Sequence, residues 1–137
     1  MKPILHISDL HVEPVGKLAY AKANTARRMI ELTEWLKHHE SEYEAIVVTG
    51  DLSCDGNIDA YHLIRAVFSS LGRPSFMVPG NHDRRKPFLE SLSSFCPGYF
   101  SEQNLSFSVD LGDYFLFLLD TLQPGIHWGA VPDAVLD

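Results

Sequence analysis

Short apolar runs alternate along the chain with longer segments in which apolar residues recur every three or four positions. Three short runs, at residues 4–7, 45–48 and 75–78, contain the residue types that favour extended backbone and predict strands. Residues 18–39 and 61–71 carry their apolar positions at helical spacing and predict helices. Strands and helices that alternate with short connections predict an α/β fold.

The remainder of the chain predicts a shorter helix and a hairpin. Residues 87–94 are expected to be helical, and residues 105–110 and 114–119 predict two hairpin strands. Every position of the run 114–119 is apolar, which is typical of a strand that is covered on both faces. No repeat, low-complexity tract or linker interrupts the sequence, so a single domain over residues 1–137 is expected.

A polar cluster follows each of the first three predicted strands. The clusters are Asp9-Leu10-His11, Gly50-Asp51 and Gly80-Asn81-His82-Asp83. Because ligands gather at the carboxyl ends of the strands in an open α/β sheet, we expect these three loops to meet at one edge. Carboxylate, imidazole and amide groups repeated at that edge predict a metal site built from several loops.

The donor types and their order suit a pair of divalent metals. Two metals about 3.5–4 Å apart can hold a hydroxide and polarise a phosphoryl oxygen for in-line attack. Asp51 is the candidate bridging carboxylate, because it lies between the other two clusters in the chain. Asp9 and His11 are expected to bind one metal together. Asn81 offers the other metal a neutral oxygen, which adds no negative charge that would repel a phosphate.

Two residues next to Asn81 are candidates for proton transfer. His82 suits a general acid that protonates the leaving oxygen, and Asp83 is expected to orient the His82 ring. A single Asp-x-His sequence is common by chance, so the prediction depends on the three clusters occurring in order.

Composition narrows the possible partners. The formal net charge of −7 disfavours nucleic acid, which usually requires a basic surface. No run approaches the roughly 20 apolar residues of a membrane span, and the start of the chain lacks the pattern of a secretory signal. Cys54 and Cys96 form no CxxC pair and are expected to be reduced thiols. A cytoplasmic location is therefore expected.

The three clusters and their strands resemble the first three motifs of the calcineurin-like metallophosphoesterases. Within them, the chain is similar to the bacterial class III cyclic-nucleotide phosphodiesterase and glycerophosphodiesterase group. The resemblance implies an αββα sandwich and hydrolysis of a cyclic nucleotide or glycerophosphodiester by a metal-bound hydroxide at a dinuclear Mn, Fe, Co or Zn centre. It assigns the first metal to Asp9 and His11, the bridge to Asp51 and the second metal to Asn81. It also gives His82 the catalytic role and places His127 at the substrate pocket.

The resemblance covers essentially the whole chain, and the family pattern continues beyond it. The family continues with another histidine and a Gly-His-x-His motif, which complete both metal sites, and neither is found here. Residues 1–137 are therefore expected to be the N-terminal half of the usual domain, truncated at its C-terminus, with an incomplete second metal site. The alternative to a phosphodiesterase is a fragment that binds metal weakly and is inactive unless another chain complements it. Half a sandwich would leave part of the apolar run 114–119 exposed, and an uncovered strand or apolar face would favour a homo-oligomer.

Overall fold

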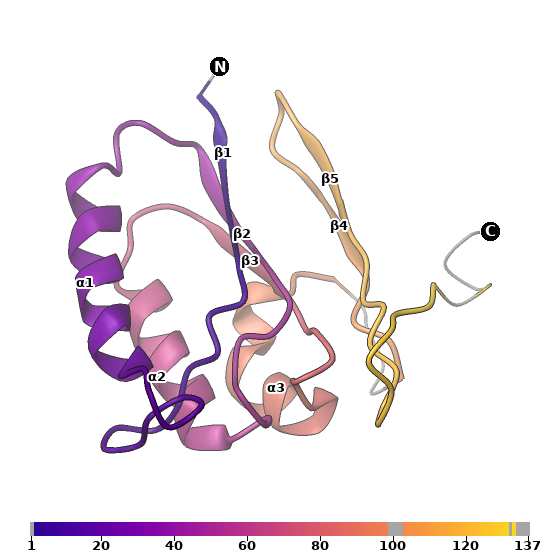
Figure 1. Ribbon diagram of the computed structural model, residues 1–137. Coiled ribbons are helices and arrows are strands. Elements are labelled where there is room, and N and C mark those ends of the chain that lie inside the picture. The colour runs from indigo at the N-terminus through magenta and orange to yellow at the C-terminus, as the bar shows by residue number, and fades with distance from the viewer. Residues whose placement is uncertain (1, 99–102, 132, 134–137) are drawn as a thin grey trace.

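The computed structural model describes residues 2–98, 103–131 and 133, and it has a mixed α/β architecture (Figure 1). In chain order the elements are β1 (Ile4–Ser8), α1 (Thr25–His38), β2 (Ala45–Thr49), α2 (Ile58–Ser69), β3 (Ser75–Val78), α3 (Arg85–Leu92), a 3-10 turn η1 (Ser93–Phe95), β4 (Phe107–Asp110) and β5 (Phe115–Leu118). The expected alternation of strand and helix is confirmed. This arrangement agrees with the N-terminal half of an αββα sandwich.

The first three strands form a parallel sheet in the order β1-β2-β3. Leu5 pairs with Ile46, and Ile7 pairs with Val48, so these side chains share one face of the sheet. Met77 continues the row beside Val48. Val48 and Met77 are completely buried, as expected for a sheet that is covered on its faces. All three carboxyl ends therefore lie at the same edge.

Helices α1 and α2 cover one face of the sheet (Figure 1). Helix α1 begins at Thr25, so the expected helix over residues 18–39 was wrong in its first turns. Asn24 ends the preceding loop and caps the helix by accepting the Arg27 N–H at 3.0 Å. Within that loop, Ala19 and Ala23 form an isolated β-bridge, which competes with helical hydrogen bonding. The apolar periodicity gave no sign of this turn.

Strands β4 and β5 form an antiparallel hairpin on the side of the sheet away from α1 and α2 (Figure 1). Phe107 and Leu118 pair with each other and are buried in the common core. Phe115 and Phe117 alternate with the buried positions and are 58% and 72% exposed. No described element packs against the outer face of this hairpin, so part of the apolar run is exposed, as expected of half a sandwich.

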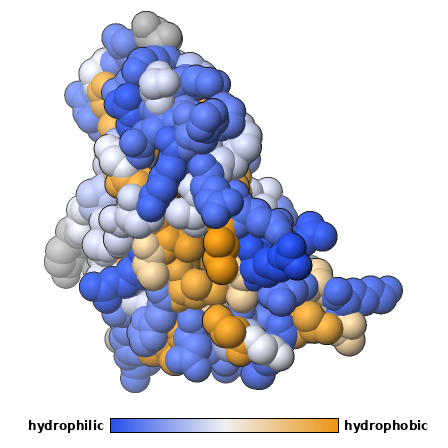
Figure 2. All heavy atoms as spheres, turned by 90° about the vertical axis from the view of Figure 1, so that its left-hand side faces the viewer, coloured by the Kyte–Doolittle hydropathy of each residue, from blue (hydrophilic) through white to orange (hydrophobic). Residues whose placement is uncertain are grey.

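Apolar side chains also reach the surface of the helical layer, where Figure 2 shows an apolar patch surrounded by polar atoms. Ile30 on α1 is exposed and lines a shallow groove between α1 and α2 together with Ala66 and Val67. Within the described residues, no helix combines the length and the apolar character needed to cross a membrane.

Candidate metal centre

The loops that follow β1 and β2 are joined by backbone hydrogen bonds. Asp9 donates its N–H to the Gly50 carbonyl at 3.2 Å, and His11 donates to the Asp51 carbonyl at 2.9 Å. Asp9, His11 and Asp51 all adopt left-handed backbone, with φ of 57°, 43° and 52°. Few residues other than glycine adopt this conformation, and outliers of this kind cluster at functional sites. Three of the four expected metal ligands therefore occupy strained positions.

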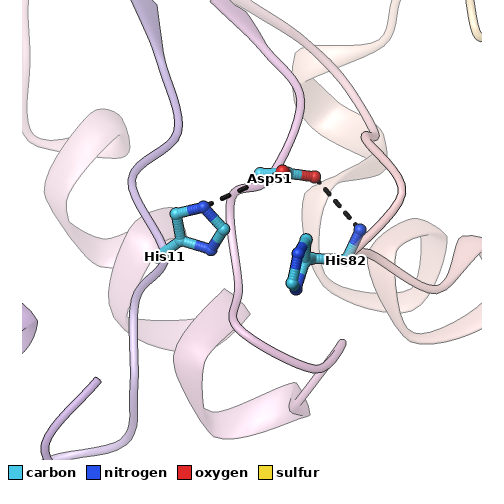
Figure 3. Close-up of side chains that lie close together, drawn as sticks. All are labelled: His11, Asp51 and His82. Atoms are coloured by element: carbon cyan, nitrogen blue, oxygen red, sulfur yellow. Dashed lines mark hydrogen bonds and ion pairs between the residues drawn. The ribbon is translucent and has the colours of Figure 1, made fainter. Parts of the chain in front are cut away.

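His11, Asp51 and His82 come together where these loops meet the loop after β3 (Figure 3). One potential ligand atom from each lies within 4.8 Å of the others. His11 Nε2 is 3.8 Å from Asp51 Oδ2, and the His82 backbone N–H donates to Asp51 Oδ1 at 3.0 Å. The Asp51 carboxylate thus contacts the His11 ring and the His82 backbone, and the two imidazole rings lie edge to face with their centroids 4.9 Å apart.

The loop between β2 and α2 orients the ring of His82. His82 Nδ1 lies 2.9 Å from the Cys54 carbonyl oxygen. Since a carbonyl only accepts, Nδ1 must carry the hydrogen, and Nε2 is left for other partners. The expectation that Asp83 orients this ring was wrong. Asp83 is buried, and both of its oxygens accept hydrogen bonds from other groups.

Asp83 instead joins three separate segments of the chain. Its carboxylate accepts the N–H groups of Leu52 at 3.1 Å, Ser53 at 3.0 Å and Gly80 at 2.8 Å, and the Tyr61 hydroxyl at 2.9 Å. Burial raises the pKa of the Asp83 carboxyl, while these four donors favour its ionised form and oppose the rise. The loops after β2 and β3 are therefore tied to α2 directly behind the cluster.

Gly80 lets the loop after β3 approach Asp51 closely. A Cβ atom at this position would lie 2.4 Å from both the backbone nitrogen and Oδ1 of Asp51. No side chain fits there unless both the Asp51 carboxylate and the neighbouring backbone move. The glycine before Asn81 thus leaves the space that the Asp51 carboxylate occupies.

A cavity of about 190 Å³ opens beside the cluster. Four residues singled out in the sequence line it: Asp9, Asp51, Asn81 and His127. The segment that carries His127 also contributes Thr121 and Trp128 to the wall. His11 and His82 do not line this cavity but flank Asp51 at its edge. Every residue expected at the site therefore lies in or next to one region, except Asp83, which supports it from behind.

Tyr20 is a neighbour of the cluster that the sequence did not reveal. Its hydroxyl lies 3.2 Å from His11 Nδ1, and the two rings meet edge to face with centroids 5.5 Å apart. Tyr20 reaches this position because it and Ala21 both adopt left-handed backbone. That conformation has no signature in the sequence, since neither residue is glycine or asparagine.

The thiol of Cys54 is close to the cluster but is not among the three side chains whose potential ligand atoms come together. Burial raises its pKa to about 11. Its Sγ donates to the His11 carbonyl at 3.1 Å. Cys54 therefore supports the loop that carries His11.

The donor chemistry of the site fits divalent metal ions. Carboxylate oxygens, imidazole nitrogens and an amide oxygen are ligands for Mn, Fe, Co and Zn. The space kept open by Gly80 and the strained backbone at three candidate ligands both favour a site shaped around bound ions.

Comparisons with known proteins agree with this geometry. The sequence profile of the family described as calcineurin-like phosphoesterase matches residues 2–127. A glycerophosphodiester phosphodiesterase of Enterobacter lignolyticus is 29% identical over 95% of this chain and 47% of its own length. A 3',5'-cyclic adenosine monophosphate phosphodiesterase of Pseudomonas aeruginosa is 28% identical over 98% of this chain and 47% of its own length.

A cAMP/cGMP dual specificity phosphodiesterase of Mycobacterium tuberculosis is 32% identical over 93% of this chain and 41% of its own length. The chain thus spans about half the length of the curated relatives that it matches. The profile match includes all three strand-end loops and extends to His127. The chain therefore belongs to the calcineurin-like phosphoesterase family, whose members use divalent metals.

Proposed function

We propose that this chain carries the substrate-facing loops of a metal-dependent phosphodiesterase, with Asp9, His11, Asp51 and Asn81 as ligands for two divalent ions. The observation that carries the proposal is that Asp51, which contacts both His11 and His82, lines the same cavity as Asp9 and Asn81. When bound, the metals would supply a nucleophile at neutral pH and neutralise charge on the phosphoryl oxygens.

Asp51, Asn81 and His82 have different proposed roles. Asp51 is the group best placed to contact both ions, because its carboxylate contacts the His11 ring and the backbone of the loop that carries Asn81 and His82. Asn81 contributes a neutral oxygen to the cavity, so it does not repel an anionic phosphodiester. The structure also supports an acid role for His82, since the Cys54 carbonyl holds its Nδ1–H and leaves Nε2 able to hold a proton for the leaving oxygen.

The proposed substrates are small phosphodiesters, either cyclic nucleotides or glycerophosphodiesters. The names of the relatives cover both classes. The cavity of about 190 Å³ is on the scale of a phosphoryl group and part of one ester arm. Exposed His127 and Trp128 lie at its wall, where they can contact that arm.

Turnover of bis(p-nitrophenyl) phosphate with added Mn²⁺ tests the proposal. We expect the wild-type chain to release p-nitrophenolate, and Asp51→Ala to reduce kcat/KM by at least about 100-fold, because it removes the central ligand. Asp59→Asn is the matched control, since Asp59 is an exposed carboxylate on α2 that lies outside the cluster. Absence of wild-type turnover, or equal turnover in wild type and Asp51→Ala, would overturn the proposal.

A further inference from the structure

A second, larger cavity of about 500 Å³ lies on the other side of His82. It shares Asn81 with the metal-site cavity, and the segment around Pro124 and Gly125 forms part of its wall. If His82 serves the leaving oxygen, this cavity is where the leaving arm of a phosphodiester would lie.

Two of the charged groups around this second cavity are already paired. Asp83 accepts four hydrogen bonds from neighbouring segments, as described above. Arg85 donates from Nε to Asp120 Oδ2 at 2.6 Å and from a terminal nitrogen to Asp120 Oδ1 at 3.0 Å. Because both residues are largely buried, this ion pair is a fixed part of the wall. The charges of Asp83 and Arg85 are therefore not available to a ligand.

Arg84 is the cation of this wall whose charge remains available. It is exposed, and among the described residues no carboxylate forms an ion pair with it. Asp55, also in the wall, is exposed and does not pair with Arg84.

The stem of Arg84 is held against the loop between β2 and α2. A Cβ atom on Gly56 would lie 2.4 Å from Arg84 Cγ and 2.8 Å from Arg84 Cβ. Gly56 is buried and has a φ of +74°, so this position suits glycine for both its backbone and its lack of a side chain. The Arg84 backbone N–H also donates to the Tyr61 hydroxyl at 3.2 Å. The backbone and the first side-chain carbons of Arg84 are therefore held in place beside His82.

We infer that Arg84 is a specificity-determining residue, which binds an anionic substituent on the leaving arm of the phosphodiester. The inference rests on the proposed function. The substituent is a carboxylate or a phosphate, because a guanidinium presents paired donors that match either group. Phosphodiesters with such a leaving arm are thus favoured over those with a neutral one.

Two chromogenic substrates that differ by one carboxylate test this inference. Methyl 4-nitrophenyl phosphate has a neutral leaving arm, and methyl 3-carboxy-4-nitrophenyl phosphate carries a carboxylate on the same ring. We expect the ratio of their kcat/KM values, anionic over neutral, to fall about fivefold in Arg84→Gln, since a solvent-accessible ion pair is worth roughly that factor. Lys86→Gln is the matched control, because Lys86 is an exposed cation two positions further along the chain, in the first turn of α3, and lines neither cavity.

The outcomes separate the two proposals. An unchanged substrate ratio in Arg84→Gln, with both substrates still hydrolysed, would overturn the role of Arg84 and leave the proposed function standing. An equal fall in Lys86→Gln would also overturn it, because the effect would then come from overall charge. Failure of the wild-type chain to hydrolyse either substrate would instead count against the phosphodiesterase activity itself.

Discussion

Individual residues at this site adopt backbone conformations that folding alone does not favour. Left-handed backbone at Asp9, His11 and Asp51 costs on the order of 1 kcal/mol or more at each position. Hydrogen bonds between the loops hold these conformations in place. These conformations direct side chains from the loops after β1 and β2 toward the same cluster. Gly80, in the loop after β3, also contributes to the cluster, because it leaves room for the Asp51 carboxylate.

Replacing Gly80 by alanine should therefore damage both stability and metal binding. The added methyl group would meet Asp51 at 2.4 Å, and overpacking of this kind costs about 1–3 kcal/mol. We expect urea unfolding to show that loss and calorimetry to show weaker Mn²⁺ binding. Gly72→Ala is the control, since its methyl group would meet the flexible Glu40 carboxylate, far from the cluster in the sequence. Wild-type affinity for Mn²⁺ in Gly80→Ala would contradict this account.

At the scale of elements, the site is an assembly of loops tied together by a buried carboxylate. Local sequence was enough to predict the three strands and to find the polar cluster after each one. It could not show that Asp83 bonds to Leu52 and Tyr61, which lie 31 and 22 positions away. Because Asp83 follows His82 in the sequence, it was expected to orient the His82 ring. In the structure the Cys54 carbonyl contacts that ring instead.

Asp83→Asn should loosen the attachment of these loops to α2. An asparagine side chain has a single acceptor oxygen, so at least one of the four donors would lose its partner in the buried interior. We expect a loss of about 2–4 kcal/mol in the free energy of unfolding, measured by urea denaturation. Tyr61→Phe removes one of the four hydrogen bonds and should cost about 1 kcal/mol. Equal costs for the two variants would show that the backbone donors contribute little.

At the scale of the whole molecule, the sequence predicted the order of helices and strands better than where each helix begins or which side chains are exposed. The α/β alternation and the hairpin followed from periodicity, because each element buries one face. The loop before α1 did not, because its β-bridge and left-handed residues leave the apolar spacing unchanged. The apolar run that contains Phe115 and Phe117 is typical of a covered strand, yet both side chains are exposed. Their burial depends on what packs against the strand, which the run itself does not specify.

This exposed hairpin face should make the isolated chain self-associate. Phe115 and Phe117 lie next to each other on it, with ring centroids 5.0 Å apart, and contiguous apolar surface favours association. We expect sedimentation velocity to show oligomers that Phe117→Thr reduces. Ile30→Thr changes an apolar residue on the helical layer that is also exposed, and this control should not reduce them. A wild-type chain that stays monomeric at tens of micromolar, on the order of assay concentrations, would contradict the prediction.

Metal binding by the Asp51 cluster tests the central claim most directly. Isothermal titration with Mn²⁺, combined with elemental analysis, should give about one tightly bound ion per wild-type chain, because His11 is the one imidazole among the four proposed ligands. Asp51→Asn should weaken that affinity by at least about 10-fold, and Asp59→Asn should leave it unchanged. Equal Mn²⁺ affinity in wild type and Asp51→Asn would show that the three loops do not form a metal centre around this carboxylate.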